Sequence, residues 1–128
     1  MDDLVRSHTA SMLGIDNQPS TEIKKELDVT VCKLNLISVF AHIKGADIRV
    51  TSGYRCPRLN ELVGGAKSSL HMQGRAVDFI VSDNKVQKDL CTFLRDSTTR
   101  TALGICEIRE YSSFLHVGFS RTFRPEEE

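Results

Sequence analysis

The densest group of chemically active side chains lies between Ser69 and Asp78. Within it, His71 and Asp78 are separated by a glycine bend at Gly74 and by the beginning of an expected strand. An imidazole and a carboxylate joined in this way can converge on one metal ion. Catalytic zinc sites usually take three protein ligands from His, Asp or Glu and leave a fourth position open. We therefore predict a zinc site that requires one further ligand.

His116, on the last expected strand, is the strongest candidate for the third ligand. Of the four histidines in the chain, His8 lies in a weakly patterned N-terminal segment and His42 ends a long expected helix. Imidazole and carboxylate ligands favour zinc, although manganese or cobalt could take the same place. The predicted metal set is therefore His71, Asp78 and His116, with Zn²⁺ as the cofactor.

Glu110 is the carboxylate that we expect to act as general base and acid. If residues 111–113 form a simple hairpin turn, Glu110 faces Phe114 and Ile108 faces His116, so these side chains share one face of the sheet. Glu110 and His116 are then diagonal neighbours, roughly 7 to 8 Å apart. A carboxylate at that distance could take a proton from water that zinc has acidified and return it to the leaving amine.

The hydrophobic pattern predicts the elements that hold these residues. Apolar side chains recur at three- and four-residue steps in the expected helices and alternate in the expected strands. We expect a small antiparallel sheet with flanking helices, which is the α+β class. The expected helices are 4–13, 20–45, 56–63 and 86–94, and the expected strands are 47–51, 75–81, 104–110 and 114–119.

Length and composition indicate one domain over residues 1–128, with a lead-in at 1–19 and a frayed tail at 124–128. Apolar residues make up 40% of the chain and charged residues 27%, as in ordinary globular proteins. The formal net charge is zero, which argues against nucleic acid as a partner. No apolar stretch is long enough to span a membrane, and the N-terminus carries no export signal. We expect a monomer.

The four cysteines are widely spaced and form no Cys-x-x-Cys pair. We interpret all four as reduced thiols in the core, and two disulfides remain the alternative. They are Cys32, Cys56, Cys91 and Cys106.

Several motifs in order resemble the zinc D-alanyl-D-alanine carboxypeptidase family, which also includes phage L-alanyl-D-glutamate endolysins. The similarity extends from about Ser7 to Phe119 and includes the lead-in Gly14 to Pro19. The motifs are Thr51-Ser52-Gly53-Tyr54-Arg55, Leu59-Asn60, Val63-Gly64-Gly65-Ala66, Ser69-x-His71-x-x-Gly74-x-Ala76-x-Asp78 and Phe114-Leu115-His116-Val117.

The resemblance implies a fold shared with these peptidases and with hedgehog signalling domains. It also implies zinc on His71, Asp78 and His116, and a nearby carboxylate as the catalytic base. Arg55 would bind a substrate carbonyl or carboxylate and stabilise developing negative charge, and Ser69 would assist in substrate binding.

The chain departs from the family pattern around the last motif. Many relatives carry the catalytic glutamate where this chain has Ser113, and tryptophan where it has Phe114. Ile105 and Cys106 replace residues that are commonly polar in the family. These differences concern the base and the substrate preference more than the metal.

The resulting expectation is a zinc metallopeptidase that hydrolyses a peptide bond in the stem peptides of peptidoglycan. A cleft bounded by Arg55, Lys67 and Arg75 would suit peptides rich in carboxylates. Without an export signal, the protein would be made in the cytoplasm and act at the cell wall or periplasm, as a phage lysis or virion-associated enzyme does. The alternative is a non-catalytic zinc-containing binding or structural module, as in hedgehog proteins. The sequence leaves open which bond is cut, carboxypeptidase versus endopeptidase action, and the host.

Overall fold

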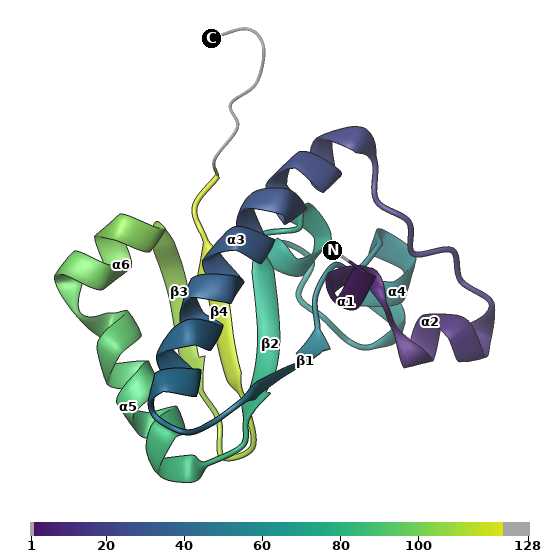
Figure 1. Cartoon of the computed structure of the whole chain (residues 1–128). Coiled ribbons are helices and arrows are strands. Elements are labelled where there is room, and N and C mark those ends of the chain that lie inside the picture. Colours follow the sequence, from purple (N-terminus) through teal and green to yellow (C-terminus); the bar gives the residue numbers. More distant parts are fainter. Residues whose placement is uncertain (1, 122–128) are drawn as a thin grey trace, which may run out of the picture.

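A computed structural model describes residues 2–121 as a four-stranded antiparallel sheet with helices on both sides, which confirms the α+β class (Figure 1). The strands lie in the order β1-β2-β4-β3. The elements in chain order are α1 (Asp2–Val5), α2 (His8–Leu13), α3 (Thr21–Ile43), β1 (Ile48–Ser52), α4 (Pro57–Leu62), the 3₁₀ turn η1 (Leu70–Gln73), β2 (Ala76–Val81), α5 (Asn84–Arg95), α6 (Ser97–Leu103), β3 (Ile105–Glu110) and β4 (Leu115–Phe119).

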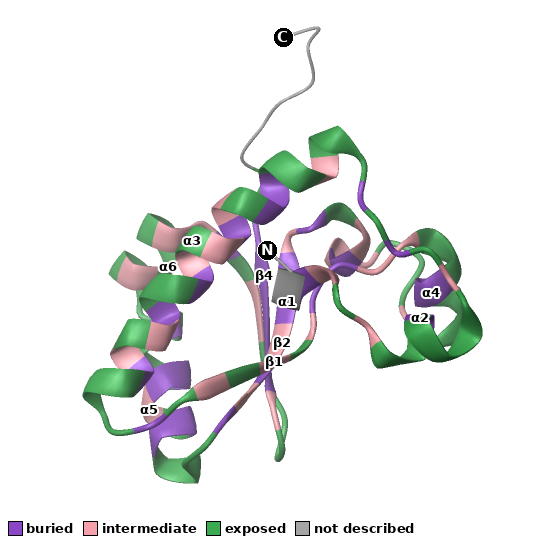
Figure 2. Cartoon of the chain, turned by 45° about the vertical axis from the view of Figure 1, so that its right-hand side comes forward, coloured by how far each residue is buried: buried purple, intermediate pink, exposed green. Residues whose placement is uncertain are grey.

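One face of the sheet packs against α3 and α5. The helix α3 begins at the cap residue Ser20, whose hydroxyl accepts a hydrogen bond from the amide of Ile23. Its buried positions include Leu27, Leu34 and Ala41, which lie on one side of the helix as the pattern predicted, and also Ile37, which the pattern did not include. Figure 2 views the sheet nearly edge-on, with α3, α5 and α6 on one side and α1, α2 and α4 on the other.

The alternation of side chains along the two central strands separates the core from the polar face. Val77 and Phe79 of β2 and Val117 of β4 are fully buried in the core that α3 and α5 cover. Asp78 lies between the two β2 residues in sequence and therefore points to the opposite face. The strand pairing places Asp78 beside His116, so both side chains rise from that second face.

The turn between β3 and β4 differs by one residue from the turn that we predicted. The amide of Tyr111 donates to the carbonyl of Phe114, so Phe114 belongs to the turn and Glu110 pairs with Leu115. His116 consequently pairs with Arg109, and the predicted pairing of Ile108 with His116 is wrong. A slip of one residue moves every side chain of a strand to the other face of the sheet.

Some other expectations also need correction. The N-terminal segment forms two short helices rather than one, and α6 was not predicted because Ser97–Leu103 is too polar to show a stripe. The four thiols are free, but Cys32 and Cys106 are exposed and are not core residues. The expected frayed tail, 124–128, lies outside the described residues. Within residues 2–121, no helix is both long and apolar enough to cross a bilayer.

Asn17 ties the N-terminal segment to the loop that follows β1. Its side-chain amide donates to the carbonyls of Val5, at 2.8 Å, and Tyr54, at 3.0 Å. Its side-chain oxygen accepts from the amide of Cys56 at 2.8 Å. Asn17 is buried, and its hydrogen bonds fix the backbone on both sides of Arg55. The segment expected as a lead-in is thus part of the structure around Arg55.

We expect Asn17→Ala to destabilise the protein by about 2 to 4 kcal/mol, since each buried polar group left without a partner costs about 1 to 3 kcal/mol. Urea unfolding followed by circular dichroism measures the change. The neighbouring Gln18→Ala is the control, because the Gln18 side chain is exposed and the substitution keeps the backbone amide, which donates to Oδ1 of Asp16. Equal midpoints for the two variants would contradict the prediction.

Candidate metal centre

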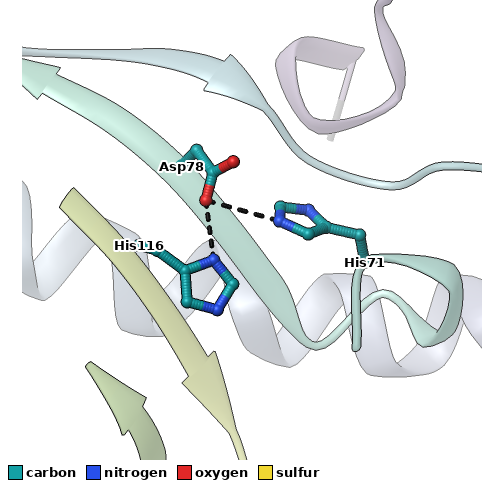
Figure 3. Close-up of side chains that lie close together, drawn as sticks. All are labelled: His71, Asp78 and His116. Carbon is teal, nitrogen blue, oxygen red and sulfur yellow. Dashed lines mark hydrogen bonds and ion pairs between the residues drawn. The ribbon is translucent and has the colours of Figure 1, made fainter. Parts of the chain in front are cut away.

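The structure brings His71, Asp78 and His116 together, although they lie far apart in the sequence. Their potential ligand atoms all lie within 4.8 Å of one another. Asp78 and His116 are paired neighbours on β2 and β4, and His71 reaches them from the turn η1 (Figure 3). Two imidazoles and one carboxylate are a ligand set typical of catalytic zinc sites.

His71 is held so that one ring nitrogen faces the other two residues. Its Nδ1 donates a hydrogen bond to the carbonyl of Gly53 at 2.7 Å, which fixes the tautomer with a lone pair on Nε2. Nε2 is buried and has no hydrogen-bond partner, although Oδ1 of Asp78 lies 3.3 Å away. A buried nitrogen that carries a lone pair and lacks a donor partner is costly unless a cation is bound. This geometry therefore fits a metal ion.

His116 and Asp78 are in direct contact. Nδ1 of His116 lies 2.7 Å from Oδ1 of Asp78. Burial alone would raise the pKa of Asp78, but the hydrogen bond with His116 and the adjacent imidazole of His71 hold that pKa well below the usual range. Burial alone would lower the pKa of His116, but the carboxylates of Asp78 and Glu107 raise it above its ordinary value. Asp78 is therefore ionised at neutral pH, as a metal ligand must be.

Arg55 lies next to this group because the loops that carry Arg55 and His71 are bonded to each other. The backbone amide of Arg55 donates to the carbonyl of His71 at 3.1 Å. Burial lowers the pKa of the Arg55 guanidinium, and the nearby negative charge of Asp78 raises it. Nε of Arg55 is buried without an acceptor in the protein. The guanidinium therefore retains an unused donor beside the three residues.

Ser69 lies at the beginning of η1, where its hydroxyl oxygen accepts from the amide of His71 at 3.2 Å. This contact orients the turn that carries the first ligand. Since a serine hydroxyl also has one proton to donate, the same side chain can still contact a substrate oxygen.

The carboxylate that contacts His116 is Glu107, and not Glu110. Oε1 of Glu107 lies 2.8 Å from Nε2 of His116. Glu110 is on the opposite face, where its carboxylate neighbours the thiol of Cys91 in α5. The structure therefore does not bring Glu110 to the three residues, and the geometric reason for choosing it as the base fails with the predicted register. The alternation in β3 would have pointed to Glu107 had the turn been placed correctly.

A cleft of about 950 Å³ reaches Asp78 and Arg55 and extends along the outer strand β1. Arg6, Arg49 and Arg55 line it, and Asp78 is the only acidic residue among the described residues that do so. Lys67 and Arg75, which we expected at its edge, do not line it. Arg75 instead donates to the carbonyl of Phe119 at 3.0 Å and to the side chain of Gln73 at 2.7 Å.

Comparison with known protein families identifies the chain. Residues 1–118 match a family described as peptidase M15. A search of curated proteins found no match. The matched range contains His71, Asp78 and His116, the group that could hold a metal ion. The chain therefore belongs to the peptidase M15 family, the zinc-dependent metallopeptidases that include D-alanyl-D-alanine carboxypeptidases.

Proposed function

We propose that the protein hydrolyses a peptide bond in the stem peptides of peptidoglycan, as a zinc-dependent carboxypeptidase or endopeptidase. The observation that carries the proposal is the convergence of His71, Asp78 and His116, of which Asp78 lines a cleft that Arg55 also lines. Zinc held by three such ligands would supply a Lewis acid for a peptide carbonyl and would acidify water.

The residues of the chain have separate tasks in this reaction. His71, Asp78 and His116 would hold the metal through Nε2, Oδ1 and Nδ1, the atoms that face one another. Arg55 would bind a carbonyl or carboxylate of the substrate with the donors that the protein leaves unused, and would stabilise negative charge as it develops. Ser69 would donate its hydroxyl proton to a substrate oxygen.

The charge of the cleft favours a substrate with carboxylates. Arg6, Arg49 and Arg55 line it, and among the described residues of its lining the acidic one is Asp78, whose charge the metal would neutralise. Stem peptides carry several carboxylates, and complementary charge aids both encounter and orientation. The three arginines thus replace the predicted set that included Lys67 and Arg75.

We propose further that the protein acts as a monomer at the cell wall and that it belongs to a phage or a prophage as a lysis or virion-associated enzyme. The cationic cleft is consistent with a polymer whose peptides are anionic.

The second candidate function is a non-catalytic zinc-containing module on the same fold. It gains support from Glu110, because the carboxylate that we expected as the base lies on the opposite face from the ligands. Such a module would hold zinc and bind a peptide without cutting it.

Digestion of purified peptidoglycan tests the two candidates. We expect the zinc-loaded wild type to release peptide fragments that mass spectrometry identifies, and the same protein after zinc removal with a chelator to release none. The fragment masses also show whether the cut falls at D-Ala-D-Ala or at L-Ala-D-Glu. Stoichiometric zinc without any released fragment would contradict the proposal and favour the binding module.

A further inference from the structure

Glu107 contacts a metal ligand from the side that faces away from the other two. Nδ1 of His116 faces Asp78, whereas Nε2 of the same ring donates to Oε1 of Glu107 at 2.8 Å. A metal bound on the Asp78 side leaves Nε2 to carry the ring proton. Glu107 is then placed to accept a hydrogen bond from Nε2 of His116, and it is not itself a metal ligand.

We propose that Glu107 is a positioning residue, which fixes the ring of His116 with Nδ1 toward Asp78 and His71. Ligating histidines commonly donate their second ring N–H to a carboxylate, which sets the tautomer, holds the ring and increases its basicity. We infer this role from the metal centre alone, and it holds whichever peptide is the substrate.

Gly118 makes the contact possible. Glu107 pairs with Gly118 across the strands, and its side chain lies over the glycine. A Cβ atom at Gly118 would come within 2.7 Å of Oε1 and 3.1 Å of Cβ of Glu107, and within 3.0 Å of Cδ1 of Leu70. The missing side chain at Gly118 therefore provides the space through which Glu107 reaches His116.

The other contact of Glu107 does not account for its position. Arg109 lies 3.8 Å from Oε2 of Glu107, but the Arg109 side chain is 58% exposed. An exposed ion pair at this distance contributes little. The contact with His116, whose side chain is only 8% exposed, is the one shielded from solvent.

The test compares zinc affinity in Glu107→Ala, Glu107→Gln and Glu110→Ala by competition with a chromogenic chelator. We expect Glu107→Ala to weaken zinc binding about 10- to 100-fold, as is usual for loss of an outer hydrogen-bond partner. Glu107→Gln should recover part of this loss, because its amide oxygen can still accept from Nε2. Glu110→Ala is the matched control on the other face of the same strand and should bind zinc as the wild type does.

Gly118→Ala tests the same contact without altering a charge. The variant should weaken zinc binding in the presence of Glu107, and much less in the Glu107→Ala background, where no carboxylate remains to be displaced. The contact with Leu70 is present in both backgrounds, so a double-mutant cycle removes it. Additive effects in this cycle would overturn the proposal.

Nuclear magnetic resonance of the histidine rings gives a second readout that does not depend on catalysis. In the zinc-loaded wild type, the Nε2 proton of His116 should be protected from exchange, and Glu107→Ala should lose that protection. The proposal is overturned if both Glu107 variants bind zinc as tightly as the wild type. It is also overturned if the variants lose hydrolysis but keep the zinc affinity of the wild type, because Glu107 would then act directly in the proton transfer of hydrolysis.

Discussion

Replacing Asp78 with alanine is expected to abolish stoichiometric zinc binding and, with it, hydrolysis of the peptide substrate. Asp78 supplies the only negative charge of the three-residue group, and its Oδ1 faces the rings of both His71 and His116 (Figure 3). Without it, two neutral imidazoles would have to hold a dication. The loss of zinc affinity should exceed roughly 100-fold, the upper range found when a residue that only hydrogen-bonds to a ligand is removed, because Asp78 would be a direct ligand.

The measurement is the zinc content of dialysed protein together with the release of fragments from peptidoglycan. Asp78→Asn keeps the shape of the side chain and should also fail to retain zinc, which separates loss of the ligand from misfolding. Asp47→Ala is the control, because the Asp47 side chain is 88% exposed and its ion pair is with the exposed His42 at 3.8 Å. If Asp78→Ala retained zinc at wild-type stoichiometry, the assignment of the metal centre would be wrong.

The metal group was predictable from the sequence because its geometry follows from local rules. A glycine bend at Gly74, with a positive φ of 71°, ends the turn that carries His71, and β2 begins shortly afterwards. The alternation of β2 turns Asp78 away from the apolar core formed by Val77 and Phe79. The ionised side chain of Asp78 on that face then needs only His116 from β4 beside it to complete the group with His71.

The position of the carboxylate near His116 could not be predicted in the same way. It depends on whether Phe114 belongs to the strand or to the turn, and the sequence Tyr-Ser-Ser-Phe allows both. In the structure the rings of Tyr111 and Phe114 stack with centroids 4.5 Å apart, across the turn. A shift of one residue in the register places Glu107, and not Glu110, on the face of the sheet that carries His116. An error in the turn therefore leads to the wrong choice of carboxylate.

The role of Asn17 was missed for a different reason. Its three partners, Val5, Tyr54 and Cys56, are backbone groups from segments distant in sequence, and backbone groups leave no mark on the residue pattern. An asparagine two residues before a proline indicates only a loop, and residues 15–20 form neither helix nor strand in the structure. Only the tertiary fold shows that this segment supports the loop of Arg55.

Arg55→Ala is expected to lower kcat/KM for the peptide substrate about 100- to 1,000-fold, the range found when one donor to a developing negative charge is removed. Arg55→Lys should recover little, because an ammonium cannot reproduce the planar fork of donors. Zinc affinity should change little in either variant. The contact of this residue with His71 is made by its backbone amide, which both substitutions keep.

Arg58→Ala is the matched control for this effect, because Arg58 follows closely in the same segment but is exposed on α4 and does not line the cleft. Initial rates on a soluble stem peptide, measured beside zinc content, separate loss of substrate binding from loss of metal. A rate within about twofold of the wild type would remove Arg55 from the reaction, since a single lost charge-assisted hydrogen bond is worth about 1.5 to 3 kcal/mol. Equal losses of rate and of zinc would instead mean that Arg55 supports the metal centre, and the substrate would then have to be bound by Arg6 and Arg49, the other arginines of the cleft.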